Sequence, residues 1–311
     1  MCRSFVARSE TELLVFTANG LVKSVDVADL PVGTRSSRGT RLTELVDTNP
    51  DDAIIAVHPV PDTTDERFVL TISRQGLVKR TSLSEYGNVR GAGIRAAGLA
   101  TDDRLLEVRL TDGTADVVLA TRRGQMIRFD ESEIRPMGRS ARGVKGIELT
   151  EDDELVGCVC PRPDDDLFLV TVAGRTKRLP LTEVRRQGRA GKGLSVLPDR
   201  EQAGDLVGIV SGEGDRPVVY ETTSGTLING RTGVSPTVAR RDVAAPIRAP
   251  GRLEALVAVH PRVGGSAPST SAASDVVPTP APESRLGITE AAELAATGGT
   301  QQELGLDAGG S

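Results

Sequence analysis

The 311-residue sequence contains no tryptophan and only seven tyrosine and phenylalanine residues together, which disfavours propellers of the tryptophan-aspartate type. Its three cysteines, Cys2, Cys158 and Cys160, provide neither a disulfide framework nor the four ligands of a structural zinc site. No apolar run approaches the roughly 18 residues of a spanning helix, and the first residues lack the apolar centre of a secretory signal. These absences predict a cytoplasmic chain with no metal, no cofactor and no membrane contact.

The net charge of −5 argues at first sight against a polyanionic partner. Residues 262–311, however, hold six acidic residues and two arginines, so their net charge of −4 leaves only −1 for residues 1–261. This tail is rich in proline, serine and alanine, a composition that buries little apolar surface. We therefore predict a mostly disordered acidic tail over 262–311 and a nearly neutral domain over 1–261, which can still present a basic edge.

Internal repetition is the strongest signal in the chain. Each unit begins with a short apolar run, reaches a glycine and resumes with a second short run, which is the pattern of two strands joined by a tight hairpin. A third apolar run closes the unit, and a period of about 50 residues predicts an all-β disc of propeller or pinwheel type with about five four-stranded blades. The hairpin glycines are Gly20, Gly76, Gly124, Gly174 and Gly225. The repeats are predicted at about 11–60, 66–111, 115–160, 166–211 and 216–261.

Acidic residues recur at two places in the unit. Pairs such as Asp51-Asp52 precede the closing strand and have the oxygens that magnesium prefers, but their recurrence favours turn chemistry over a metal site. Single acids follow the hairpin in a capping or turn position, at Asp29, Glu85, Glu133 and Glu183.

Each unit also carries cations between its hairpin and its closing strand. Because equivalent positions of a radial repeat occupy equivalent places on the disc, these cations are predicted to form one continuous basic belt. The glycines among them let backbone amides approach phosphate oxygens, and the lack of aromatic side chains favours duplex DNA over single strands. The predicted DNA contacts are Arg35, Arg38, Arg41, Arg90, Arg95, Arg139, Arg142, Lys145, Arg185, Arg186, Arg189, Lys192, Arg240 and Arg241.

Two alternatives compete with this interpretation. Any single cluster is compatible with a solvated loop, and the whole chain is compatible with a protein-interaction propeller that binds no DNA. Five clusters at the same phase of a repeat favour nucleic acid. Backbone contacts along a curved row read no base sequence and favour DNA that is bent or easily bent.

In combination, the repeats resemble a known family. Residues 10–261 are similar to the C-terminal pinwheel domain of the A subunit of bacterial DNA gyrase and topoisomerase IV. The resemblance implies a non-catalytic accessory region that binds and bends or wraps duplex DNA for an ATP-dependent type IIA topoisomerase. It also implies two partners, the breakage-reunion domain and the ATPase B subunit. The most similar stretches are Leu14-Val15-Phe16-Thr17-Ala18-Asn19-Gly20-Leu21-Val22-Lys23, Gly76-Leu77-Val78-Lys79-Arg80-Thr81 and Ile134-Arg135-Pro136-Met137-Gly138-Arg139.

The sequence departs from the family pattern in two respects. The gyrase signature box, Gln-Arg-Arg-Gly-Gly-Lys-Gly, belongs on the first of about six blades, whereas the nearest match here is altered in order and spans 185–193 in the fourth repeat. The box-bearing blade is therefore expected to be absent, which leaves a gyrase-type and a topoisomerase IV-type role both open. The only tyrosines, Tyr86 and Tyr220, lie inside repeats and are expected to pack on sheets, so the chain is predicted not to be an enzyme by itself.

Overall fold

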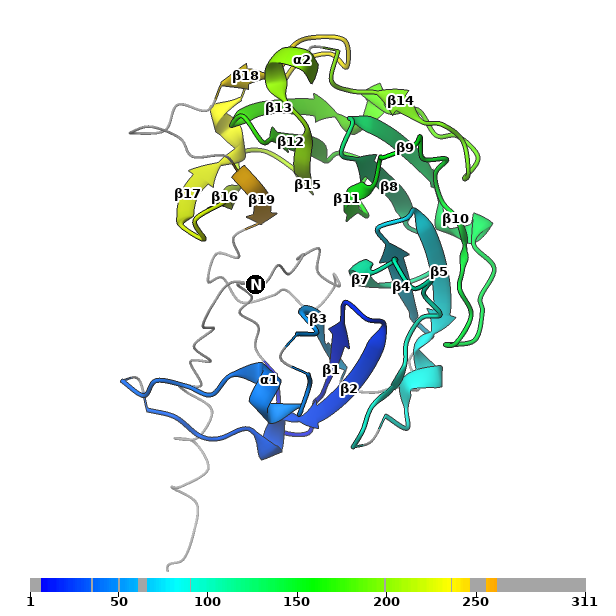
Figure 1. Ribbon diagram of the computed structural model, residues 1–311, viewed down its shortest axis with the longest axis vertical. Helices are drawn as coiled ribbons and strands as arrows, with labels where there is room; N and C mark the ends of the chain where they lie inside the picture. The colour runs from blue at the N-terminus through cyan, green and yellow to red at the C-terminus, as the bar shows by residue number, and fades with distance from the viewer. Residues whose placement is uncertain are drawn as a thin grey trace, which may run out of the picture.

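Five small antiparallel sheets stand side by side around a central axis and form a C-shaped disc (Figure 1). The computed structural model describes residues 7–34, 36–49, 51–60, 66–89, 91–198, 200–235, 237–246 and 256–261. The predicted all-β fold with about five blades is confirmed. The predicted disordered tail, 262–311, lies outside the described residues.

Each repeat contributes a hairpin and an inner strand to one blade. The hairpins pair β1 (Glu12–Thr17) with β2 (Leu21–Asp26), β4 (Phe68–Ser73) with β5 (Leu77–Ser82), β8 (Asp116–Thr121) with β9 (Gln125–Asp130), β12 (Asp166–Thr171) with β13 (Arg175–Pro180), and β16 (Pro217–Thr222) with β17 (Leu227–Arg231). The inner strands are β3 (Ile54–Val60), β7 (Leu105–Thr111), β11 (Leu155–Val159), β15 (Leu206–Gly212) and β19 (Leu256–Pro261).

The helices are short and lie in the connections. Four of the 3-10 helices contain the recurrent acids that the sequence placed after the hairpins. The helices are η1 (Val27–Asp29), α1 (Leu42–Leu45), η2 (Leu83–Tyr86), η3 (Glu131–Glu133), η4 (Leu181–Glu183), α2 (Arg200–Ala203) and η5 (Thr232–Val234).

In the first three blades an aspartate joins the hairpin to its inner strand, as turn chemistry predicted. Asp103 Oδ1 accepts the backbone N–H of Gln75 at 3.1 Å, and Asp153 Oδ1 accepts that of Arg123 at 3.0 Å. The residue that follows each of these amides is a hairpin glycine with positive φ, such as Gly76 at 81°. The carboxylates therefore satisfy backbone donors that the tight turn leaves without a strand partner.

The fourth strand of a blade comes from the following repeat. The outer strands are β6 (Ile94–Arg95), β10 (Val144–Lys145), β14 (Leu194–Ser195) and β18 (Ala245–Pro246), and they pair with β2, β5, β9 and β13 of the preceding blades. Blade 5 has three strands among the described residues, because no described strand pairs with the outer edge of β17. The sequence indicated four strands per unit but not this exchange, which carries the basic loops of repeats 2 to 5 onto the rim of the preceding blade.

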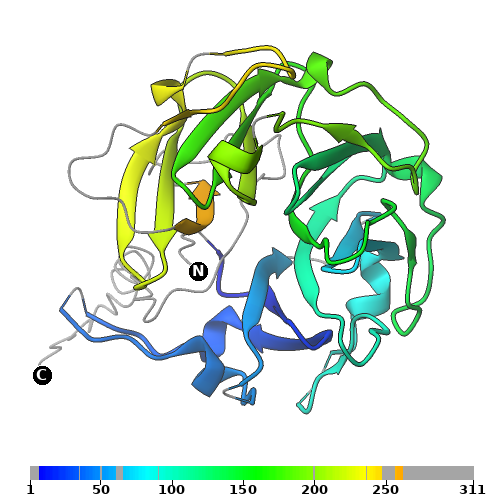
Figure 2. The same ribbon diagram turned by 45° about the horizontal axis from the view of Figure 1, so that its top comes forward.

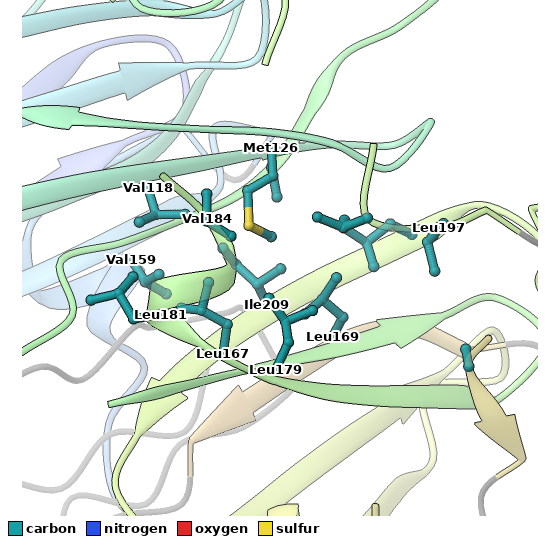
Figure 3. Close-up of a cluster of buried hydrophobic side chains, with 14 of the residues drawn as sticks. Val118, Met126, Val159, Leu167, Leu169, Leu179, Leu181, Val184, Leu197 and Ile209 are labelled. Atoms are coloured by element: carbon teal, nitrogen blue, oxygen red, sulfur yellow. The ribbon is translucent and has the colours of Figure 1, made fainter. Parts of the chain in front are cut away.

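Apolar clusters hold successive blades together. Between blades 3 and 4, Val118 and Met126 pack against Leu167 and Leu169, each fully buried (Figure 3). Comparable clusters lie at the junctions of blades 1 and 2, 2 and 3, and 4 and 5. A fifth cluster is internal to blade 1, where α1 and its flanks cover the free face of the sheet. Within the described ranges no apolar cluster joins blade 5 to blade 1.

Polar side chains also connect the inner strands. Glu107 Oε2 accepts the backbone N–H of Cys158 at 3.0 Å, and Arg109 Nη2 donates to the carbonyl oxygen of Cys158 at 2.7 Å. Glu107 and Arg109 form an ion pair with each other at 2.7 Å. Cys158 is a buried free thiol in this arrangement.

Candidate nucleic-acid interface

The basic loops of repeats 2 to 5 run along the periphery of the disc, because the exchanged outer strands lie there (Figures 1 and 2). Arg95 lies in β6 and Lys145 lies in β10, on the outer edges of blades 1 and 2. The loop of the first repeat differs, since it leads into α1 and covers blade 1 itself. The strand exchange therefore brings cations from four repeats to one rim.

The predicted contact residues fall into three groups. Arg35 and Arg90 lie outside the described residues. The half-buried residues are Arg139, Arg189 and Arg240. The exposed residues are Arg38, Arg41, Arg95, Arg142, Lys145, Arg185, Arg186, Lys192 and Arg241.

The half-buried arginines are anchored by acids of the preceding repeat. Glu133 Oε2 accepts the backbone N–H of Arg189 at 3.0 Å, and the Arg189 side chain donates to the carbonyl oxygens of Glu133 and Lys145. Glu183 Oε2 likewise accepts the backbone N–H of Arg240 at 2.9 Å. The acids that the sequence indicated as turn residues thus also fix the next rim loop.

The Arg186 side chain connects the rim loop of repeat 4 to blade 3. Its guanidinium bonds to Asp116 at 2.7 Å and approaches Asp130 at 3.4 Å, both in blade 3. Asp116 also pairs with Arg128 at 2.6 Å. Burial alone would raise the pKa of Asp116, but the hydrogen bonds from Arg128 and Arg186 outweigh it and hold that pKa below its usual range.

Backbone hydrogen bonds link neighbouring rim loops directly. Gly98 N donates to the carbonyl oxygen of Ala141 at 3.0 Å, joining the loops of repeats 2 and 3. Ala190 N donates to the carbonyl oxygen of Gly146 at 2.7 Å, joining those of repeats 3 and 4. These bonds make the cation-bearing loops parts of one arc.

Sequence reasoning missed the lysines beneath this arc. Lys79 and Lys177 are each 1% exposed, although they belong to strands quoted only for their apolar pattern. Both donate hydrogen bonds to carbonyl oxygens of rim loops. The available signal was a lysine three residues after the hairpin glycine, which recurs at Lys23, Lys79 and Lys177.

Metal binding and membrane insertion are the next two possibilities that the described ranges bear on. They hold no group of three or more His, Cys, Asp or Glu side chains arranged to bind a metal ion. No helix in the described part of the chain has the length and apolar character needed to cross a membrane. Tyr86 and Tyr220 are buried at 0% and 2% exposure, and burial raises the pKa of each hydroxyl to about 12. Both tyrosines pack on sheets, as expected.

A cavity of about 610 Å³ lies on the axis between the inner strands. Its charged lining carries both signs, including Arg104 and an ion pair between Arg74 and Glu154 at 3.4 Å. Such a lining does not favour a polyanion, in contrast to the rim.

Comparisons with known proteins agree with this architecture. A sequence profile described as the DNA gyrase C-terminal domain, beta-propeller, matches residues 11–61, 67–112, 115–161 and 165–211. The A subunit of DNA gyrase from Haloquadratum walsbyi (strain DSM 16790 / HBSQ001) is 38% identical over 147 residues, which are 46% of this chain and 17% of that protein. The alignment thus spans about a sixth of the length of the curated relative.

Solved structures give the same picture. The crystal structure of the C-terminal domain of DNA topoisomerase IV superposes with a TM-score of 0.75 at 26% identity, covering 81% of this chain and 79% of that one. The DNA gyrase A C-terminal domain superposes with a TM-score of 0.68 at 17% identity, covering 83% and 84%. The second likeness concerns the fold alone.

Proposed function

Because the chain belongs to the DNA gyrase C-terminal domain family, we propose that it binds duplex DNA along its outer rim and bends it. In this proposal the chain is an accessory region of an ATP-dependent type IIA topoisomerase and has no catalytic activity by itself. The breakage-reunion domain and the ATPase B subunit would act on the DNA that the rim presents, in the cytoplasmic nucleoid.

The observation that carries the proposal is the row of cations on the exchanged rim loops. Among the described residues, no hydrogen bond or ion pair engages the side chains of Arg95, Arg142, Lys145, Arg185, Lys192 and Arg241. Unpaired guanidinium and ammonium groups on an exposed edge bind phosphate oxygens without first breaking an internal ion pair. The convex arc favours a duplex that follows its curvature.

The rim cations have two roles in this proposal. Arg186 and Arg189 hold their loop against blade 3, while Arg185 and Lys192 on the same loop contact phosphates. The segment 185–193, which is the nearest match to the family's signature box, thus contains both residues that hold the loop on blade 3 and residues that contact DNA. A gyrase-type and a topoisomerase IV-type role are equally compatible with this arrangement.

The test is a titration of a fluorescently labelled linear duplex at several salt concentrations. Each neutralised phosphate contributes about −0.9 to the slope of log affinity against log salt, so six contacts predict a slope of about −5. Dyes at the two duplex ends report bending by energy transfer in the same samples. Absent or salt-independent binding would contradict the proposal and favour a protein-interaction propeller.

A further inference from the structure

A buried ammonium group lies between two rim loops at blade 2. Lys79 donates to the carbonyl oxygen of Ala96 at 2.5 Å and to that of Arg139. Ala96 directly follows β6, at the outer edge of blade 1, and Arg139 belongs to the loop that continues into β10, at the outer edge of blade 2. The lysine therefore joins the rim loops of two successive blades.

The same device recurs two blades further on. Lys177 donates to the carbonyl oxygen of Val196 at 3.0 Å, of Arg240 at 2.6 Å and of Asp242 at 2.5 Å. Val196 directly follows β14 on blade 3, and Arg240 belongs to the loop that continues into β18 on blade 4. Both carbonyl positions are equivalent to those that Lys79 uses, so the arrangement is a repeated feature of the fold.

Blade 3 is an internal comparison. Ile127 occupies the position of the lysines, three residues after the hairpin glycine Gly124. There Ala190 N donates directly to the carbonyl oxygen of Gly146, the residue that follows β10. Ala190 adopts a φ of 66°, which is unfavourable for a residue other than glycine. At each of these three blades a donor thus reaches the same carbonyl position of the rim, by an ammonium group or by a strained backbone amide.

Core packing alone does not account for the lysines. Burying an ammonium group costs desolvation energy, and burial lowers the pKa of Lys79 to about 8. An apolar residue fills the equivalent site of blade 3 without that cost. The hydrogen bonds to the two loops are what a lysine adds.

We propose that Lys79 and Lys177 are positioning residues that fix the angle between neighbouring rim loops and thereby the curvature that the rim imposes on duplex DNA. This inference rests on the proposed DNA-binding function. The lysines touch no phosphate, and they act through the loops that carry Arg139, Arg142, Arg240 and Arg241.

The test compares the wild type with Lys79→Met, Lys177→Met and their combination, which keep the side-chain length and remove the charge. Hydrogen exchange of the rim amides measures how firmly the rim loops are held in the absence of DNA. We expect Gly98 N–H in Lys79→Met and Val238 N–H in Lys177→Met to exchange at least about tenfold faster, while β4 and β12 stay protected. Should a methionine variant unfold, Lys79→Ile provides the residue that blade 3 already carries.

Two DNA measurements separate positioning from contact. The methionine variants should lose bending, seen as energy transfer falling to that of free duplex, while the salt slope stays within about 0.5 of the wild type. Lys145→Ala removes an exposed rim cation. It should make the slope of log affinity against log salt less steep by about 0.9 and leave the hydrogen exchange of the rim amides unchanged.

The possible failures are distinguishable. Wild-type bending in the variants, or unchanged rim exchange, would overturn the positioning role while wild-type DNA binding keeps the proposed function. A wild type that binds no DNA would overturn the proposed function and the role in curvature with it, whatever the exchange rates show.

Discussion

Arg186 Nε donates to Asp116 Oδ1 at 2.7 Å and so ties the rim loop of repeat 4 to the first strand of blade 3. Arg185, its neighbour in sequence, is exposed and has no partner among the described residues. Two adjacent arginines of one loop thus differ in role, and a substitution at each should affect a different property of the protein.

Arg186→Ala should lower the free energy of unfolding more than Arg185→Ala does, because it leaves the buried Asp116 with Arg128 as its remaining cation. The decrease should be small, because the Arg186 side chain is 56% exposed and water screens the pair. Urea unfolding monitored by circular dichroism measures the change. Arg185→Ala is the matched control and should stay within about 0.5 kcal/mol of the wild type. Equal losses of unfolding free energy in the two variants would contradict a stabilising contact between Arg186 and Asp116.

The combined change Arg185→Ala and Lys192→Ala should weaken duplex binding without weakening the fold. Loss of two phosphate contacts predicts a salt slope that is less steep by about 1.8. Fluorescence anisotropy titrations at several salt concentrations measure it. Arg162→Ala removes an exposed cation of the connection between β11 and β12, which is not one of the rim loops, and serves as the control. If Arg162→Ala changed the salt slope by as much for each charge removed as the double variant does, the rim would not be the DNA-binding site.

The blades could be predicted from the sequence because each hairpin contains a glycine that needs positive φ, and because an aspartate stands shortly before each of the first four inner strands. The strand exchange could not be predicted. A strand of two residues, such as Val144-Lys145, has no periodicity to recognise, and its partner lies in another repeat.

The sequence also did not indicate which rim cations bond to a neighbouring blade and which have no partner among the described residues. Arg185 and Arg186 are identical in type and adjacent, and only the position of Asp116, seventy residues before Arg186, separates them. Lys79 was missed for a related reason. A lysine in a strand is usually exposed, and its burial here depends on carbonyl oxygens that two different loops supply.

Acid should remove the contribution of the Asp116 network. The folded-state pKa of Asp116 lies below its usual value, so its contribution is fully present above the unfolded pKa of about 3.9 and is lost as pH falls through the folded pKa. Asp116→Asn should therefore be less stable than the wild type at pH 7, and the gap should narrow toward pH 3. Urea unfolding of both proteins across this range tests it. A constant gap would mean that the carboxylate charge plays no part.

Alkali should act in the opposite sense on Lys79. Its folded-state pKa is about 8 against 10.5 for the free side chain, so between these values the unfolded state binds more protons. The stability of the wild type relative to Lys79→Met should be flat below about pH 8 and rise above it, by at most about 1.4 kcal/mol per pH unit. Chemical unfolding from pH 7 to 9.5 measures this difference. A relative stability that falls with pH would contradict the burial of a charged ammonium group.

Gly143→Ala should detach a rim loop, because the glycine lies directly on the strand that carries Lys79. Its φ is 92°, and an added Cβ would lie 2.6 Å from the carbonyl oxygen of Val78. The strained backbone and the clash together predict a loss of at least about 2 kcal/mol, unless β10 separates from β5. Gly138→Ala, where an added Cβ meets nothing within 4 Å, is the matched control on the same loop. Hydrogen exchange of Gly146 N–H, which donates to Gly76 O, distinguishes local detachment from global unfolding. Detachment speeds exchange at Gly146 alone, whereas global loss speeds it in β4 and β5 as well, and an alanine tolerated at both positions would contradict the close packing of the exchanged strand.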